Sequence, residues 1–365
     1  MNKYSPLCQD LTIFILTYNR PEALKRQLES LQHFPGVVTV LDGGFTDLNS
    51  LNYLSKPSKF SYIQNPLFSE RFSKAGESLN TKYAMTFSDD DLLLASGVNF
   101  LMQKITTGNT DSIFGRMLYA YPLKTSWGFR LWKPSYSTLK DRTILGSDSP
   151  RRAIDHFTNY VTSYFYSIMK EHTWQETFAR LKLPNEDMKI NPYALELAYE
   201  FLGAIAGTIE IIPILCGIRV KDQKPTWLEN KNEFGNLISM TTWLANSEYG
   251  KSVDSYKHAI LDACSQSKSS ANTEKALDKA LLQFTLLEQN AGLIGNKPRD
   301  HYRKKKRFTI SNLLILFEQL LVNFKLSKIL VRVKTKKILR ELELESINYE
   351  IVDVQLAVKL LYDKF

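Results

Sequence analysis

Three consecutive carboxylates, Asp89, Asp90 and Asp91, follow the apolar run Tyr83–Phe87 after a single serine. Carboxylates this close together repel one another unless a cation neutralises them. A divalent metal suits such a group, because Mg²⁺ or Mn²⁺ binds one or two protein carboxylates and keeps its other positions for water and substrate phosphates. The alternative is a solvated turn in which Asp91 caps the next helix. The triplet therefore predicts either a metal and phosphate site or a solvated turn.

The aspartates belong to a repeated pattern in which apolar runs of strand length alternate with helical or turn segments. The runs are Leu11–Leu16, Val37–Leu41, Phe60–Ile63 and Tyr83–Phe87. Pro21 follows the first run and suits the first turn of a helix. This alternation predicts an α/β fold with a parallel sheet flanked by helices.

Polar residues follow each of these four runs. They are Thr17–Arg20, Asp42 with two glycines, Asn65, and the aspartate triplet. Ligands of such sheets bind outside the carboxyl ends of the strands. We therefore expect all four polar segments at one edge of the sheet.

The rest of the chain contains fewer strands. The pattern predicts further strands at Ser112–Tyr119 and Thr208–Cys216, and helices at Ala153–Lys170 and Tyr193–Leu202. The first of these helices carries aromatic residues at spacings of three and four, which would form either core or a wall for a sugar acceptor. After about residue 230 the pattern is mainly helical.

The strand-end residues resemble those of GT-A glycosyltransferases of the family-2 type, and of a bacterial subfamily with an Asp-rich D-x-D motif in particular. The resemblance covers about residues 10–220. It implies a GT-A type fold, a Rossmann-like and mostly parallel sheet flanked by helices, with a C-terminal helical extension. We expect a catalytic domain at 1–230, a helical segment packing on it at 231–298, and a basic amphipathic helical region at 299–365.

The resemblance also implies a donor site. Thr17, Tyr18 and Arg20 match the segment that lines the nucleotide, and Asp42 matches the carboxylate that hydrogen-bonds the base. Asp42 before two glycines is as readily a turn residue.

The aspartate triplet would hold the sugar and the metal. Asp89 and Asp91 match the D-x-D pair, with Asp90 between them in the donor site, and imply Mg²⁺ or Mn²⁺ on the diphosphate. Lys74 and Asn80 lie in the preceding segment, which contributes to the donor site in the family, although a lone lysine is more often a solvated surface residue.

An inverting transfer needs a base beside the acceptor hydroxyl. The family places an acidic residue about one hundred residues after the D-x-D motif, and the matching region is Glu196–Glu200, which lacks the family's usual Glu-Asp pair. Glu200 is the first candidate and Glu196 the second. Both glutamates equally fit the solvated face of a helix. Arg219, at the end of the Ile211–Ile218 run, would bind the diphosphate or lie on the surface.

Composition bounds the remaining possibilities. The three cysteines, Cys8, Cys216 and Cys264, form no close pair, and no apolar run approaches the roughly 20 residues of a membrane span. The chain has neither a P-loop nor a G-x-S-x-G motif, and its five histidines form no metal-binding pattern. We expect a cytoplasmic protein without a standard secretion signal.

The positive charge is concentrated near the C-terminus. Residues 299–340 carry thirteen basic and two acidic side chains, beside the amphipathic pattern of Ile310–Leu330, so the preceding chain is close to neutral. Such a region favours adsorption to an anionic membrane surface, here the inner face of the plasma membrane. The alternatives are a solvated helix packed on the body and, last, nucleic acid, for which no recognition module is present, so no nucleic-acid partner is expected.

These features together predict a metal-dependent glycosyltransferase. It would move a sugar from a nucleotide-sugar donor to a growing glycan or lipid-linked acceptor in bacterial surface polysaccharide synthesis, with inversion. The alternatives are a sugar-phosphate nucleotidyltransferase on a related fold, and a non-catalytic module that binds glycan or lipid.

Overall fold

The structure is a computed structural model, and most of the first 290 residues are described. The described ranges are 4–44, 59–122, 129–134, 142–144, 148–158, 160–182, 192–220, 239–265 and 272–290. The predicted domain boundary at residue 230 and the basic region 299–340 fall outside them.

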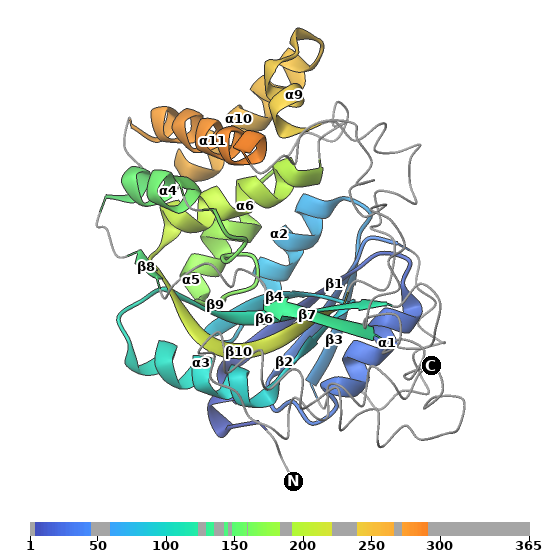
Figure 1. The fold of residues 1–365 in the computed structure, drawn as a ribbon. Coiled ribbons are helices and arrows are strands. Elements are labelled where there is room, and N and C mark those ends of the chain that lie inside the picture. The colour runs from blue at the N-terminus through green and yellow to red at the C-terminus, as the bar shows by residue number, and fades with distance from the viewer. Residues whose placement is uncertain are drawn as a thin grey trace, which may run out of the picture.

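A mixed, mostly parallel sheet forms the centre of the fold (Figure 1). Its strands run in the spatial order β3-β2-β1-β4-β9-β6-β10-β5. The first four strands in this order are parallel, as predicted, and are β1 (Leu11–Thr17), β2 (Val37–Asp42), β3 (Lys59–Gln64) and β4 (Tyr83–Ser88). Six of the seven residues of β1 are buried, because this strand lies inside the sheet.

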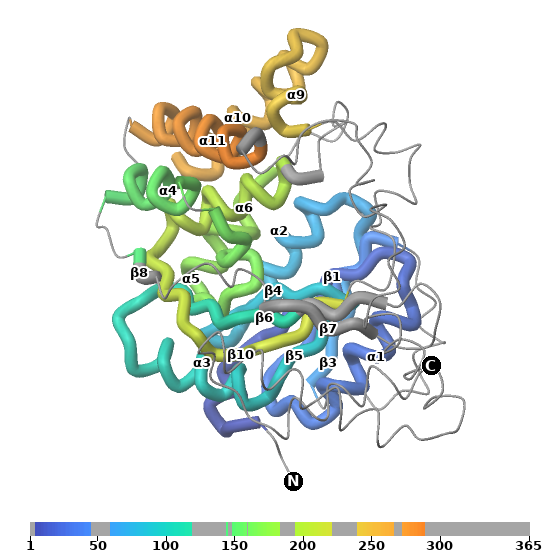
Figure 2. Tube along the Cα trace, viewed as in Figure 1, coloured from blue at the N-terminus to red at the C-terminus, as the bar shows by residue number. Residues whose placement is uncertain are grey.

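The second half of the sheet is more varied. The long strands β6 (Ser112–Pro122) and β10 (Ile209–Val220) are parallel partners and lie side by side in Figure 2, although almost one hundred residues separate them. β9 (Ile168–Lys170) is antiparallel to both β4 and β6. The short strand β5 (Asp91–Leu93) pairs antiparallel with the end of β10, and this pairing was not predicted.

Two further short strands extend this half of the sheet. β7 (Phe129–Pro134) pairs with β6, and β8 (Arg142–Ile144) pairs with β10.

Helices cover both faces of the sheet in Figure 1. α1 (Pro21–Ser30) and α3 (Ala95–Thr107) lie on one side. The other side carries α2 (Phe68–Ser78), α5 (Glu171–Trp174), which continues into one π-helical turn, and α6 (Pro192–Ala206). The fold class expected from the sequence, an α/β sheet flanked by helices, is therefore confirmed.

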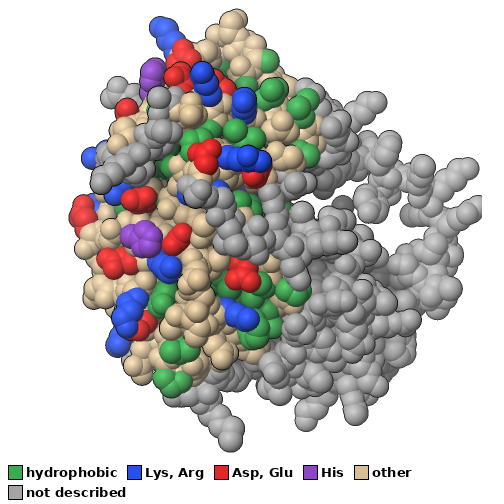
Figure 3. All heavy atoms as spheres, turned by 90° about the vertical axis from the view of Figure 1, so that its left-hand side faces the viewer, with side chains coloured by type: hydrophobic (Ala, Val, Ile, Leu, Met, Phe, Trp, Pro, Cys, Tyr) green, Lys and Arg blue, Asp and Glu red, His purple; other side chains and the backbone are tan. Residues whose placement is uncertain are grey.

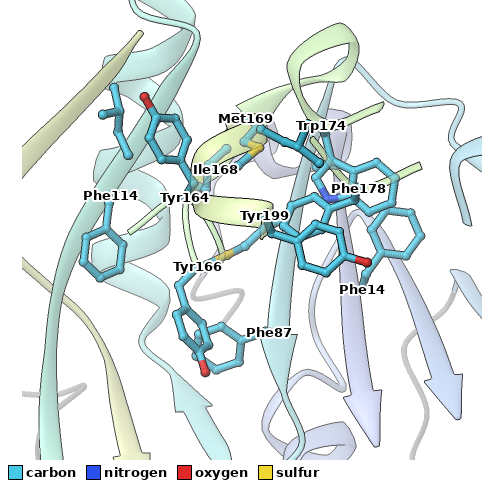
Figure 4. Packing of buried hydrophobic residues seen from close by; sticks show 14 of the residues in the cluster. Phe14, Phe87, Phe114, Tyr164, Tyr166, Ile168, Met169, Trp174, Phe178 and Tyr199 are labelled. Atoms are coloured by element: carbon cyan, nitrogen blue, oxygen red, sulfur yellow. The ribbon is translucent and has the colours of Figure 1, made fainter. Parts of the chain in front are cut away.

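An aromatic cluster fixes this second layer on the sheet (Figure 4). The ring of Trp174 stacks on Phe14 of β1 at 4.4 Å between centroids, and its Nε1 donates to Thr86 of β4 at 3.1 Å. Phe178 stacks on Phe72 of α2 and tilts against Tyr199 of α6, each at 4.9 Å. Because these rings join β1, β4, α2 and α6, they set the position of α6 above the sheet.

The predicted helix over Ala153–Lys170 is wrong in its second half. α4 spans Ser149–Thr158, and residues 160–167 are irregular backbone that leads into β9. Phe157 and Tyr164 are fully buried, so the aromatic stripe is core and not an exposed wall for an acceptor. Here the carboxylate of Glu200 on α6 accepts hydrogen bonds from three consecutive backbone N–H groups that would otherwise bond to carbonyls of a helix.

The strands stop and helices follow towards the end of the described chain, as the pattern predicted. They are α9 (Met240–Ala245), α10 (Gly250–Ser265) and α11 (Thr273–Asn290). α11 packs against α4, where Phe284 meets the edge of the Tyr160 ring at 5.0 Å. Glu288 of α11 accepts hydrogen bonds from the first backbone N–H groups of α9, at 3.3 Å from Met240 and 3.0 Å from Thr241.

The outer surface of this layer is mixed in charge, and Leu282, Leu286 and Leu287 of α11 are exposed. Figure 3 turns the side with α4 and α11 towards the viewer, and acidic and basic side chains are interspersed over its described part. Within the described residues, no helix is long and apolar enough to cross a membrane.

Candidate functional site

The sheet register brings the predicted strand-end residues next to one another. Thr17, the last residue of β1, is the partner of Asp42 on β2, and Leu16 is the partner of Ser88 on β4. The strand β1 therefore stands between the two acidic segments. Thr17 is 4 % exposed and faces the interior of this edge.

Asp89 is buried against the end of β1. Its Oδ2 accepts a hydrogen bond from Thr17 Oγ1 at 2.7 Å, and its Oδ1 accepts from Arg20 Nη1 at 3.3 Å. Burial, and then the charge of Asp90, raise the pKa of Asp89 to about 7, against the opposing effects of Arg20 and Thr17. Because Asp89 is only 2 % exposed, the solvated-turn alternative is wrong for this residue.

Arg20 supplies a positive charge to two of the three aspartates of the triplet. The same Nη1 lies 3.0 Å from Oδ2 of Asp90, so one guanidinium bridges both carboxylates. Ser88 Oγ donates to the other oxygen of Asp90 at 2.5 Å. Burial disfavours the charge of Arg20, but the two aspartates outweigh it and raise the pKa of the guanidinium.

Asp91 has a separate environment on β5. It is fully buried, and its Oδ1 accepts from the backbone N–H of Val220 at 3.2 Å. Its Oδ2 lies 3.7 Å from Nε of Arg219, its partner in the antiparallel ladder. The helix that follows is α3, whose N-cap is Leu94, so the prediction that Asp91 caps it is wrong.

Arg219 is held from two sides. Besides Asp91, it meets the ring of Tyr166, with its guanidinium carbon 4.3 Å from the ring centroid. Its side chain is 13 % exposed, which excludes the plain surface arginine of the alternative interpretation. Tyr166 in turn meets Phe87 of β4 edge to face at 5.8 Å between centroids.

Tyr166 connects the aspartate edge to α6. Burial raises the pKa of Tyr166, the charges of Asp91, Asp90 and Glu196 raise it further, and Arg219 opposes them. These carboxylates therefore lie close enough to Tyr166 to act on one phenol electrostatically. Glu196 thus acts on the same phenol as Asp90 and Asp91, although it belongs to a different layer of the fold.

Asp42 closes a tight turn after β2. Its Oδ1 accepts from the backbone N–H of Gly44 at 2.7 Å, and its Oδ2 accepts from the Tyr62 hydroxyl. The carboxylate is fully buried. These bonds fix the loop and leave the predicted contact with a nucleobase untested.

Arg71 is a residue of this edge that the sequence interpretation missed. Its Nη1 donates to Leu41 O at 3.3 Å and to Thr17 O at 3.5 Å, so it joins the ends of β1 and β2. Burial lowers the pKa of Arg71 to about 10, and Asp42 and Tyr18 oppose this effect. The signal was available, since Arg71 lies on the same helix face as Phe68, Phe72 and Ala75.

The loop after β1 is shaped by close packing. Asn19 has a positive φ of 52°, which asparagine tolerates better than most residues. A Cβ on Gly44 would lie 2.1 Å from Oδ1 of Asn19, and one on Gly43 would lie 2.6 Å from Nη1 of Arg71. Only glycine therefore fits at either position without displacing a side chain of the site.

Two predicted donor-site residues are not brought to this edge by any contact in the described part of the chain. Lys74 is exposed on α2, and no contact among the described residues joins its side chain to the strand ends. Asn80 is exposed after the end of that helix. Their assignment remains a prediction.

The two candidate bases differ in their surroundings. Glu200 is fully buried, and its carboxylate accepts from three backbone N–H groups and faces His156. An acceptor hydroxyl cannot reach it in this conformation. Glu196 is half-buried, and its Oε1 accepts from Tyr160 and Thr162, each at 2.7 Å. Neither glutamate lies on a solvated helix face.

A Glu-Asp pair that the sequence interpretation missed precedes α6. Glu186 and Asp187 follow Pro184 and Asn185, and α6 begins at Pro192. The adjacent acidic pair shortly before a helix was the available signal. Both residues lie outside the described ranges, so only their place in the sequence bears on a role.

The carboxylates of the site meet part of what a metal ion requires. Among the described residues, no group of three or more His, Cys, Asp or Glu side chains is placed to hold one. Magnesium needs only one or two carboxylates when phosphates supply further ligands. Asp89 and Asp91 fit that limited role, because a carboxylate that already accepts one hydrogen bond retains further lone pairs.

Comparisons with known proteins give structural matches only. No family model and no curated protein matches the sequence. The structure of S. aureus TarS 1-349 in complex with UDP-GlcNAc superposes with a TM-score of 0.50 and 13 % identity, covering 81 % of this chain and 76 % of that one. Another structure of TarS 1-349 matches with a TM-score of 0.44 and 13 % identity, covering 78 % of this chain and 91 % of that one. Together with the sheet order and the flanking helices, the first match shows that this chain has a GT-A type fold.

Proposed function

We propose that this protein is a glycosyltransferase that uses a nucleotide-sugar donor. The observation that carries the proposal is the convergence of Thr17, Arg20, Asp89 and Asp90 in one hydrogen-bonded network at the carboxyl ends of β1 and β4. In open α/β sheets this is where ligands bind. The fold is also that of a protein that binds UDP-GlcNAc, which makes a UDP-sugar the first donor to test.

The nucleoside would bind beside the ends of β1 and β2. Arg71, Tyr18 and Asp42 interact electrostatically there, and the glycines after Asp42 allow close approach of a ligand to the backbone. The donor diphosphate would lie towards Arg219, whose guanidinium matches phosphate geometry. A bound Mg²⁺ or Mn²⁺, held by Asp91 and Asp89, would supply charge stabilisation for the departing diphosphate.

The acceptor would be activated by a carboxylate in an inverting reaction. The acceptor hydroxyl gives its proton to the base while its oxygen bonds to the anomeric carbon. The bond from that carbon to the diphosphate oxygen breaks, and the nucleoside diphosphate leaves with the electron pair. Glu196 is one candidate, because it is only half-buried, unlike Glu200, and its charge acts on Tyr166 together with that of Asp91. Glu186 and Asp187 are the candidates favoured by their place before α6.

The acceptor class follows from the predicted context of the enzyme. We propose a growing glycan or a lipid-linked acceptor in the synthesis of a bacterial surface polysaccharide. The basic residues within 299–340 would keep the enzyme at an anionic membrane, where such acceptors are found.

Thermal shift with nucleotides tests the donor site without knowledge of the acceptor, because a ligand that binds only the folded protein raises the melting temperature. The panel is UDP, GDP, CDP, ADP and dTDP, followed by the matching sugar nucleotides, each with Mg²⁺ or with EDTA. We expect a metal-dependent shift with one base that is lost in Asp91→Asn and kept in Asp254→Asn, an exposed carboxylate on α10. Absence of a shift with every nucleotide would overturn the proposal.

A further inference from the structure

The irregular segment from Tyr160 to Ser167 is buried backbone between α4 and β9. Buried N–H groups outside regular structure need acceptors. Three consecutive ones, those of Ser163, Tyr164 and Phe165, all point at the carboxylate of Glu200, at 3.2, 3.2 and 2.8 Å. The carboxylate of Glu200 therefore takes the place of the backbone carbonyls that would accept these N–H groups in the predicted helix.

Glu200 is itself held from α4. His156 Nε2 lies 2.8 Å from its Oε2, and both side chains are 1 % exposed or less. Because the carboxylate already accepts three backbone bonds, the imidazole must donate at Nε2. A carboxylate at this depth is stable only while such donors surround it. The pair thus fastens α4, α6 and the segment between them at one point.

The segment held by Glu200 carries side chains of the candidate site on both sides. Before it, Tyr160 and Thr162 donate to Oε1 of Glu196. After it, Tyr166 supports Arg219, which faces Asp91. In Figure 4, Tyr166 points towards Phe87 while Tyr164 turns the opposite way. A displacement of the backbone at Ser163–Phe165 would therefore change the surroundings of both Glu196 and Arg219.

Packing around the segment leaves it little freedom. The Tyr164 hydroxyl donates to Gly207 O at 2.9 Å, and a Cβ on Gly203 would lie 2.6 Å from the Tyr164 ring. Glu196, Glu200 and Gly203 are spaced by four and three residues on α6, so one helix face serves the whole segment. This arrangement suits a fixed support better than a moving lid.

We propose that Glu200 is a positioning residue for the donor site. It fixes the 163–165 backbone and thereby holds Tyr166 beneath Arg219, without itself touching substrate. This inference rests on the proposed function, since it assigns Arg219 to the donor diphosphate. It also changes the role expected for Glu200 from catalytic base to support.

The test compares Glu200→Gln with Glu288→Gln in the full-length protein. Gln keeps one of the two acceptor oxygens of Glu200. In place of the other oxygen it puts an amide N–H₂ group, which is a donor and cannot accept a bond from the backbone N–H there. Glu288 is a matched control, because it is 6 % exposed and also accepts backbone N–H bonds, but at the start of α9. The Kd of UDP with Mg²⁺ is measured by calorimetry well below both melting temperatures. We expect a tenfold or greater rise for Glu200→Gln and a change within twofold for Glu288→Gln.

Further variants distinguish an effect of Glu200 that acts through Tyr166 on Arg219 from a general loss of structure. Tyr166→Phe keeps a ring beneath Arg219 and should retain UDP binding, whereas Tyr166→Leu should weaken it as Glu200→Gln does. The double variant of Glu200→Gln with Tyr166→Leu should then be no weaker than Tyr166→Leu alone. Additive losses, or an unchanged Kd in Glu200→Gln, would overturn the inference. Should Glu200→Gln not fold, His156→Phe replaces it, with an expected rise of about threefold or more.

Hydrogen exchange separates this inference from the proposed function. If the wild-type protein binds none of the nucleoside diphosphates, the proposed donor site is what fails. Exchange at the amides of Ser163, Tyr164, Phe165 and Tyr166 then tests the support directly. Glu200→Gln must accelerate it at least tenfold relative to Glu288→Gln, and equal exchange in the two variants would show that Glu200 does not hold the segment.

Discussion

Asp91 on β5 and Arg219 on β10 are partners in an antiparallel ladder, and their side chains lie 3.7 Å apart at its end. One group of the pair is fully buried and the other nearly so. The short strand β5 exists because the aspartate triplet turns back towards β10 immediately after β4. The pair therefore links the acidic motif to a residue more than one hundred positions later.

Replacing Arg219 by Leu should destabilise the fold, because it leaves the Asp91 carboxylate buried without its cation. Loss of one partner of a buried pair costs about 3 kcal/mol. The double variant Asp91→Asn with Arg219→Leu should recover most of that loss, since an amide carries no charge. Urea unfolding of the two single variants and the double variant measures both effects. Equal stability of Arg219→Leu and the double variant would contradict the pairing.

Replacing Asp89 by Asn should stabilise the protein in a pH-dependent way. Burial raises the folded-state pKa of Asp89 to about 7, well above the ordinary value of about 4 for an aspartate. The folded protein therefore holds a proton that the unfolded chain releases, so the stability from this group is full below about pH 4 and is lost as pH rises to 7. Asp89→Asn avoids this loss.

The melting temperatures of Asp89→Asn and wild type should thus diverge between pH 5 and pH 7 and then keep a constant difference up to pH 8. The expected divergence is several degrees, at about 2–4 °C for each kcal/mol in a protein of this size class. Asp254→Asn, on the exposed side of α10, serves as the control and should follow wild type at every pH. A difference in melting temperature that becomes smaller as pH rises would mean that the pKa of Asp89 is lowered on folding, and it would contradict the raised pKa that its burial causes.

The sequence predicted the sheet better than it predicted the site. The four parallel strands β1 to β4 were found because each is a buried apolar run with polar residues at its end. The short strand β5 was not predicted. Its Asp91 pairs with Arg219 of β10, which is far away in the sequence, and the local pattern contains no sign of that partner. The segment after Thr158 was called a helix because its aromatic spacing fits one, and the acceptor that prevents the helix, Glu200, lies in another element.

Buried charges account for the remaining differences. Glu200 looks like an exposed helix residue when only its own segment is considered, and Arg71 shares a helix face with apolar residues although it carries a charge. Both are buried because polar groups of other elements surround them, backbone carbonyls in one case and backbone N–H groups in the other. Such partners are fixed by tertiary structure, so residue type and spacing alone could not identify them.

Replacing Gly43 by Ala should weaken nucleotide binding through Arg71. The new Cβ would lie 2.6 Å from Nη1 and would displace the guanidinium that joins the ends of β1 and β2. We expect at least a tenfold rise in the Kd of UDP, measured by calorimetry with Mg²⁺. Gly250→Ala is the matched control, because its Cβ would have no neighbour within 4 Å. An unchanged Kd of UDP in Gly43→Ala would show that Arg71 takes no part in nucleotide binding.

The basic region should confer binding to anionic membranes. Replacing the five basic residues 303–307 by Gln removes charges that each contribute about 1 kcal/mol near such a surface. Cosedimentation with vesicles that contain phosphatidylglycerol should fall at least a hundredfold in apparent affinity, and binding of the wild-type protein should weaken with added salt because exposed charges are screened. The control replaces Lys251, Lys275 and Lys279, exposed on α10 and α11, and should bind like wild type. If the control loses binding as strongly as the 303–307 variant, the attraction depends on net charge and not on this region.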